Sequence, residues 1–113
     1  MSAITTHILD VSKGCPARGV PVALERQTTT GWEIIGKGAT DDDGRLRDLL
    51  GSEASLQTGN YRLTFDTENY FLQQQIESFY PQVTVAFTVR DATQHYHVPL
   101  LLSPFGYSTY RGS

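Results

Sequence analysis

The heptapeptide NYRLTFD, residues 60–66, is a clear indication of the fold class. Tyr61, Leu63 and Phe65 alternate with polar residues, and successive side chains of a β-strand point to opposite faces of a sheet. One face of this segment is therefore expected in a core and the other in contact with water. Similar β-branched and aromatic runs recur on both sides of it between Gly, Pro, Asn and Asp, which is typical of an antiparallel β-sandwich.

The same reasoning predicts an all-β sandwich of about eight strands with one short helix. The other strands are expected at residues 4–11, 20–27, 32–40, 45–50, 83–89, 95–102 and 107–110. The 45–50 run is short and ambiguous, and the 51–59 connection is expected to be irregular. Residues 67–75 change period, and Asp66 or Thr67 is a suitable cap for about two turns of helix.

Length and charge narrow the class of protein. A chain of 113 residues is the common size of one domain, so residues 1–113 are expected to form a single domain. The formal charge of −3 gives no field that would attract nucleic acid or an anionic membrane, and no apolar run is long enough to span a bilayer. Cys15 is the only cysteine, which excludes an internal disulfide, and residues 1–7 lack the features of a signal peptide. A soluble, cytoplasmic protein is expected.

Three histidines suggest a site. His95 and His97 lie two apart in a strand-like run, so both side chains leave the same face of a sheet. With His7 they could offer three nitrogens to zinc, but no carboxylate or cysteine at ligand spacing accompanies them, and no metal is expected. A histidine can also serve as a base or proton shuttle near neutral pH. An exposed or hydrogen-bonded strand histidine without a chemical role is the alternative.

Other candidates for chemistry are weaker. Arg45 directly follows the sequence DDDG, from which a turn could present it to a ligand or leave it solvated. The three aspartates do not form a calcium loop, because the required distant glutamate is missing. Cys15 precedes Pro16 in a loop with nothing nearby to lower its thiol pKa, and no serine has the context of a hydrolase nucleophile.

The last seven residues, YSTYRGS at 107–113, join a strand-forming run to a cationic, hydroxyl-rich end. Most domains finish in mobile polar residues, whereas Tyr and Thr favour a pleated surface and Arg offers a rigid fork of donors. This end is therefore expected to be ordered and to have a role of its own. As the last strand, residues 107–110 are expected at a sheet edge that could pair with another copy of the protein.

Several motifs together resemble the transthyretin-related family. They are HILD at residues 7–10, GCPARGVPV at 14–22, DGR at 43–45 and HYHVPLLLSP at 95–104. The ending YRGS at 110–113 resembles the C-terminal tetrapeptide of the enzymatic branch, the 5-hydroxyisourate hydrolases, and differs from the ending of the hormone carrier transthyretin. The resemblance covers essentially the whole chain.

This resemblance implies a prealbumin-like sandwich that assembles as a homotetramer, a dimer of dimers, with sites in the channel between the dimers. It implies hydrolysis of 5-hydroxyisourate at a ring amide, giving 2-oxo-4-hydroxy-4-carboxy-5-ureidoimidazoline in urate degradation. Ring hydrolysis of an activated substrate requires no cofactor. The alternative is a noncatalytic carrier of a small aromatic ligand, for which an apolar channel would suit better than one with histidines and arginines.

The resemblance also implies site residues. Histidine would take a proton from the attacking water, and arginine would bind the polar ring and stabilise the developing oxygen charge. His7, Arg45, His97 and Ser113 are the expected catalytic residues, Ser113 acting through its hydroxyl or the terminal carboxylate. The expected substrate-binding residues are His7, Arg45, Tyr110 and Arg111, with His95 adjacent in the histidine motif.

Overall fold

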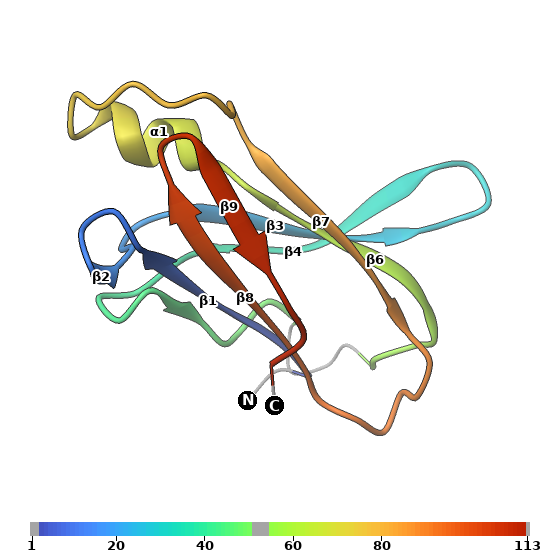
Figure 1. Ribbon diagram of the computed structural model, residues 1–113. Helices are drawn as coiled ribbons and strands as arrows, with labels where there is room; N and C mark the ends of the chain where they lie inside the picture. Colours follow the sequence, from blue (N-terminus) through green and yellow to red (C-terminus); the bar gives the residue numbers. More distant parts are fainter. Residues whose placement is uncertain (1–2, 51–54, 113) are drawn as a thin grey trace.

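The computed structural model describes residues 3–50 and 55–112, which form two packed β-sheets with one short helix at one end (Figure 1). The prediction of an all-β sandwich with a single short helix is confirmed. Ser113 and the first part of the expected irregular connection, residues 51–54, lie outside the described residues.

The two sheets are built from strands that are interleaved along the chain. The first sheet has the order β2 (Cys15–Pro16), β1 (Ile4–Asp10), β8 (Tyr96–Ser103) and β9 (Gly106–Thr109), and β5 (Arg45–Leu46) also pairs with β1. The second sheet has the order β4 (Trp32–Ala39), β3 (Pro21–Gln27), β6 (Gly59–Phe65) and β7 (Val83–Val89). The expected edge position of the last strand is confirmed, since β9 has only β8 as a neighbour within the described residues.

The described residues form nine strands, one more than expected. The additional strand is β2, whose two residues pair with Leu9 and Asp10 in a stretch expected to be a loop. The ambiguous 45–50 run contributes only the two-residue β5. The helix α1 (Thr67–Leu72) begins after Asp66, whose side chain accepts a hydrogen bond from the Asn69 N–H at 3.2 Å. This is the capping role expected at that position.

The pairing of β1 with β8 differs from the expected antiparallel arrangement, because these two strands run parallel. Between β1 and β8 the chain forms the strands of the second sheet, so no tight hairpin forces β1 and β8 to run antiparallel. The register sets Thr5 beside His97 and His7 beside Pro99. Paired residues share a face of the sheet, and the two histidine motifs therefore meet on the face that is turned away from the core.

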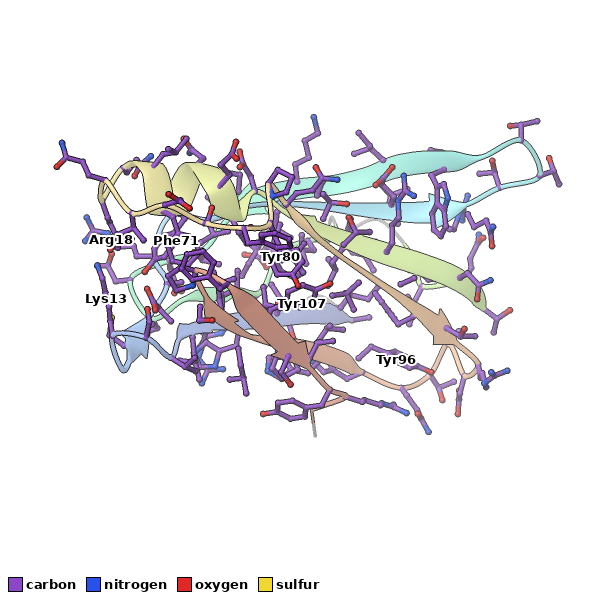
Figure 2. All side chains as sticks on the ribbon, turned by 45° about the horizontal axis from the view of Figure 1, so that its top comes forward. Lys13, Arg18, Phe71, Tyr80, Tyr96 and Tyr107 are labelled. Atoms are coloured by element: carbon purple, nitrogen blue, oxygen red, sulfur yellow. The ribbon has the colours of Figure 1, made fainter. Side chains whose placement is uncertain are left out.

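The core lies between the two sheets and contains the apolar faces predicted from alternation. Tyr61, Leu63 and Phe65 are at most 1% exposed, while Val85 and Phe87 are half-buried against the same cluster. Helix α1 closes one end by burying Phe71. Figure 2 shows Tyr80 and Tyr107 side by side near this end, and their ring centroids are 5.2 Å apart in an edge-to-face contact.

A buried carboxylate, that of Asp10, lies at the C-terminal end of β1. Asp10 is fully buried and accepts hydrogen bonds from the Tyr70 hydroxyl at 2.8 Å and from the Ser12 hydroxyl at 2.5 Å. Burial, together with the hydrogen bond to Asp10, raises the pKa of Tyr70 to about 12. The Tyr70 hydroxyl therefore stays protonated as a donor, and its hydrogen bond links β1 to helix α1.

Candidate active site

Arg45 reaches the outer face of the first sheet through a tight turn. In the pairing of β1 with β5, His7 lies directly opposite Arg45. Gly44 makes this approach possible with a φ of +75°, and a Cβ at this position would lie 2.3 Å from the carbonyl oxygen of Ile8. The Ile8 N–H instead donates to the Gly44 carbonyl at 2.7 Å. The glycine thus lets the turn lie directly against β1.

The aspartates before Gly44 organise the turn, as expected from their chemistry. The Asp41 carboxylate accepts hydrogen bonds from the N–H groups of Asp43 and Arg45, each at 2.9 Å. The Arg45 N–H is the main reason that the pKa of Asp41 lies below its usual value. Within residues 3–50 and 55–112, the Arg45 guanidinium forms no ion pair with a carboxylate. It therefore remains available to a polar or anionic ligand.

His7 is held in a defined ring orientation by the same turn. Its Nε2–H donates to the Asp43 carbonyl oxygen, and the two heavy atoms are 2.9 Å apart. A carbonyl can only accept, so the proton of the neutral imidazole lies on Nε2. The lone pair of neutral His7 is then on Nδ1. This nitrogen is able to accept a proton or a hydrogen bond.

His95 and His97 converge on a threonine that the sequence reasoning did not identify. The Thr5 hydroxyl oxygen is 2.8 Å from Nδ1 of His97 and 3.0 Å from Nε2 of His95. Thr5 is only 4% exposed, whereas His97 is half-buried and His95 is exposed. The available signal was that Thr5 lies two residues before His7 on the same strand face.

The surroundings of His97 favour its neutral form. Burial has the largest effect in lowering the pKa of His97 below its usual value, followed by the nearby positive charge of Arg45 and the neighbouring His7 and His95. A hydrogen bond to the backbone of Thr5 opposes part of this lowering. His97 is therefore neutral near pH 7 and able to act as a base.

The C-terminal tail lies against the ring of His97. The Gly112 N–H donates to the His97 carbonyl oxygen at 2.8 Å, and these residues form an isolated antiparallel bridge. A Cβ on Gly112 would lie 2.6 Å from Cδ2 of His97. The glycine thus allows the backbone of the tail to pack directly on the imidazole. The expectation of an ordered tail is confirmed as far as Gly112.

The side chain of Arg111 contacts Tyr96 and Gln94 and not the histidine face. Its guanidinium carbon lies 4.5 Å from the ring centroid of Tyr96, and it donates a hydrogen bond to the Gln94 side chain at 2.8 Å. Tyr110 is 57% exposed. The structure thus brings together three of the predicted catalytic residues, His7, Arg45 and His97. His95, the neighbour of His97 in the histidine motif, lies with them, as do Thr5 and Gly112.

A cleft of about 230 Å³ extends from His97 toward β7. His97, Tyr110 and Arg111 line it together with apolar residues such as Val85 and Phe87. His7, Arg45 and His95 are not part of its lining. The histidine face and the cleft therefore meet at His97, and the histidine face itself is open.

Among the residues that the structure describes, no group of three His, Cys, Asp or Glu side chains is arranged to hold a metal ion. The described part of the chain contains no helix long and apolar enough to cross a membrane.

Comparison with known proteins gives the family. Residues 4–112 match the model of the HIUase/Transthyretin family. A probable 5-hydroxyisourate hydrolase of Caenorhabditis elegans is 51% identical over 112 residues, covering 99% of this chain and 82% of the worm protein. The structure of Klebsiella pneumoniae 5-hydroxyisourate hydrolase superposes with a TM-score of 0.85 at 37% identity, covering 97% of this chain and 92% of that one.

The carrier branch is equally close in fold. Sea bream transthyretin in complex with thyroxine superposes with a TM-score of 0.89 at 33% identity, covering 98% of this chain and 95% of that one. Backbone similarity therefore does not separate the two branches, and the site residues must do so. Sequence, fold and comparisons agree that the chain belongs to the HIUase/Transthyretin family.

Proposed function

We propose that this protein hydrolyses 5-hydroxyisourate to 2-oxo-4-hydroxy-4-carboxy-5-ureidoimidazoline in urate degradation. The observation that carries the proposal is the face on which His7, Arg45 and His97 meet beside the C-terminal tail. This face combines the imidazole of His97, whose pKa is lowered mainly by burial, with a cation that has no carboxylate partner among the described residues. Such an arrangement suits general-base hydrolysis of a polar ring.

In the proposed reaction, water attacks a ring carbonyl of the substrate and the adjacent C–N bond breaks. Neutral His97 or His7 takes a proton from the water as it attacks. Arg45 faces the oxygen that gains negative charge, and a single donor of this kind contributes about 2.7–4 kcal/mol to transition-state stabilisation in other hydrolases. The leaving nitrogen takes up one proton, and the product is a carboxylate.

The tail completes the proposed site. Tyr110 and Arg111 bind the substrate in this proposal, and Ser113 orients a histidine or the water. Arg111 would have to leave Tyr96 and Gln94 to reach the histidine face. Substrate contact by Arg111 is therefore coupled to a side-chain movement, whereas Gly112 already lies on His97.

The proposed assembly is a homotetramer, a dimer of dimers. Its support is the free outer edges of β7 and β9 in the described chain, together with exposed aromatic residues near them. Phe79 is 69% exposed, Phe105 64% and Tyr107 42%. Free strand edges and exposed aromatic side chains are features that favour association of copies. A second dimer would place the open histidine face in the channel between the dimers, where water can still enter.

Carriage of a small aromatic ligand is the second candidate, favoured by the close match to thyroxine-bound transthyretin. A carrier site gains affinity from apolar lining, whereas the face described above presents three histidines and an arginine. Burying these groups around an apolar ligand would require desolvating them without compensation. The polar face therefore favours hydrolysis.

The test is the decay of 5-hydroxyisourate absorbance with and without the protein, starting from freshly generated substrate. We expect decay well above the spontaneous rate, proportional to protein concentration. A variant lacking residues 111–113 should lose turnover while its melting temperature changes little, because the tail is proposed to serve the site. Decay at the spontaneous rate with folded full-length protein would refute the proposal, and a binding isotherm for thyroxine would then support the carrier.

A further inference from the structure

Thr5 occupies an unusual position between two imidazoles. Its hydroxyl oxygen is within hydrogen-bond distance of His97 at 2.8 Å and of His95 at 3.0 Å. The strand pairing explains the contact, since Thr5 lies directly opposite His97 in the parallel β1–β8 ladder. The hydroxyl is buried at 4% exposure, so these two rings rather than water provide its partners.

Proton counting restricts the tautomers of the two rings. A threonine hydroxyl has one proton to donate and can accept from other donors. It cannot donate to both rings, so at least one ring must donate to it. If Nδ1–H of His97 donates and the hydroxyl passes its own proton toward Nε2 of His95, then Nε2 of His97 carries the lone pair. This is the tautomer in which His97 can accept a proton through Nε2.

The proposed hydrolysis also needs an exit for one proton. Water contributes its oxygen to the new carboxylate, and of its two protons one goes to the leaving nitrogen. When water attacks, His97 gains a proton and a positive charge near Arg45, so moving a proton from His97 to solvent at this step removes that charge. His97 is half-buried and covered on one side by Gly112, whereas His95 is exposed.

We propose that Thr5 is a positioning residue that holds His97 in the Nδ1–H tautomer and links it to His95 as a proton exit. After Nε2 of His97 takes a proton from water, Nδ1–H passes its proton to the Thr5 oxygen while the Thr5 proton moves to Nε2 of His95. Nδ1 of His95 then releases a proton to solvent. When the C–N bond breaks, Nε2–H of His97 protonates the leaving nitrogen, and the relay runs in reverse as Nδ1 of His95 takes up a proton from solvent, which restores the starting tautomers. This inference rests on the proposed hydrolysis.

The first experiment separates the hydroxyl from the shape of the side chain. Thr5→Val keeps the β-branched shape but removes the hydroxyl, and Thr5→Ser keeps the hydroxyl. We expect Thr5→Val to lower kcat at least about tenfold with little change in KM, because general acid–base transfer supplies factors of this size or larger. Thr5→Ser should stay within about threefold of the unchanged protein. Melting temperatures of both variants check that the fold is retained.

The second experiment reads the tautomer without any turnover. Nitrogen-15 NMR of the imidazoles in the full-length protein should show His97 protonated on Nδ1 at neutral pH, and this preference should weaken in Thr5→Val. Its outcome does not depend on the identity of the substrate. A dominant Nε2–H tautomer in the unchanged protein would overturn the inference even if hydrolysis is confirmed.

The third experiment tests the exit. His95→Gln retains a side chain that can hydrogen-bond to Thr5 but cannot carry a proton onward. Its kcat should fall several-fold in dilute buffer and recover when imidazole is added, because a small base in solution can replace the exit. Full activity of folded Thr5→Val, or a loss in His95→Gln that imidazole does not restore, would contradict the relay. The activity of the unchanged protein in the same assay separates these failures from failure of the proposed hydrolysis.

Discussion

The arginines on the outer faces of the two sheets differ in whether they pair with a carboxylate. On the second sheet, Arg62 lies opposite Glu25 and donates to both carboxylate oxygens, at 2.9 and 3.1 Å. Its guanidinium also stacks 4.4 Å from the ring centroid of Trp32. On the first sheet, Arg45 lies opposite His7 and has no carboxylate partner among residues 3–50 and 55–112.

This difference separates a structural charge from a functional one. The Arg62 guanidinium is paired in a bidentate way with a carboxylate of the same chain and stacked on an indole, so its charge is already compensated. In the proposed function, Arg45 instead adds to the effect of burial in lowering the pKa of His97, which favours a neutral base, and it offers a contact for an anion. Unpartnered charge next to a titratable ring marks the site better than the presence of arginine itself.

The largest expected effect is that of removing Arg45. Arg45→Ala should lower kcat/KM by about 100-fold or more, corresponding to at least ~2.7 kcal/mol of transition-state stabilisation. Arg45→Lys should recover only part of this, since an ammonium lacks the planar fork. Steady-state kinetics with 5-hydroxyisourate provide the measurement.

Arg62→Ala is the matched control on the opposite sheet. It should leave kcat/KM unchanged and lower the melting temperature slightly, since it breaks a pair with Glu25 and a stack on Trp32. Equal losses of activity in Arg45→Ala and Arg62→Ala would mean that the two arginines do not differ in function.

A smaller effect is expected from a single methyl group on the tail. The Cβ of Gly112→Ala would approach Cδ2 of His97 to 2.6 Å, so either the imidazole or the tail must move. Because misplacement of a catalytic group by about 1 Å can cost up to about 100-fold, a loss in kcat of about tenfold is expected. Gly106→Ala is the control, since its Cβ would meet only Ser103 Oγ at 3.7 Å. Unchanged kcat in Gly112→Ala would show that the tail adjusts without disturbing His97.

Local patterns in the sequence were sufficient to predict much of the fold and part of the candidate site. Alternation at residues 60–66 and 83–89 predicted β6 and β7 because each period is visible within one strand. The turn before Arg45 was equally local, since Asp41 and Gly44 act on their own neighbours. Family motifs then pointed to His7, Arg45 and His97.

What the sequence did not reveal depends on contacts between distant segments. Parallel pairing of β1 with β8 joins residues about 90 positions apart, and it alone sets Thr5 beside His97. In the sequence, only the strand face that it shares with His7 distinguishes Thr5 from Thr6, whose hydroxyl instead donates to the Val98 carbonyl at 2.6 Å. The contact of Arg111 with Tyr96 likewise depends on tertiary packing. Contacts of this kind are determined by the packing of distant segments, which local periodicity does not encode.

The smallest expected effect is on the pH dependence of stability, where the two faces should respond in different ranges. The pKa of His97 lies below its ordinary value of 6.5. In acid the unfolded chain therefore binds more protons at this residue than the folded chain, and the free energy of unfolding should decrease as pH falls from 6.5 through the lowered pKa. The pKa of Glu25 is lowered mainly by its hydrogen bond from Arg62, so its contribution is present above the ordinary value of 4.5 and lost in more acidic solution.

Urea unfolding at a series of pH values and one protein concentration can separate these contributions. His97→Gln should flatten the slope in the range just below pH 6.5 and leave the more acidic range unchanged, whereas Glu25→Gln should do the reverse, below pH 4.5. The base form of His97 persists to lower pH for the same reason, so activity should also decline only below the ordinary histidine range. An unaltered slope in His97→Gln would mean that the ring is not held neutral by burial and Arg45, and the distinction between a prepared base on one sheet and a structural ion pair on the other would be lost.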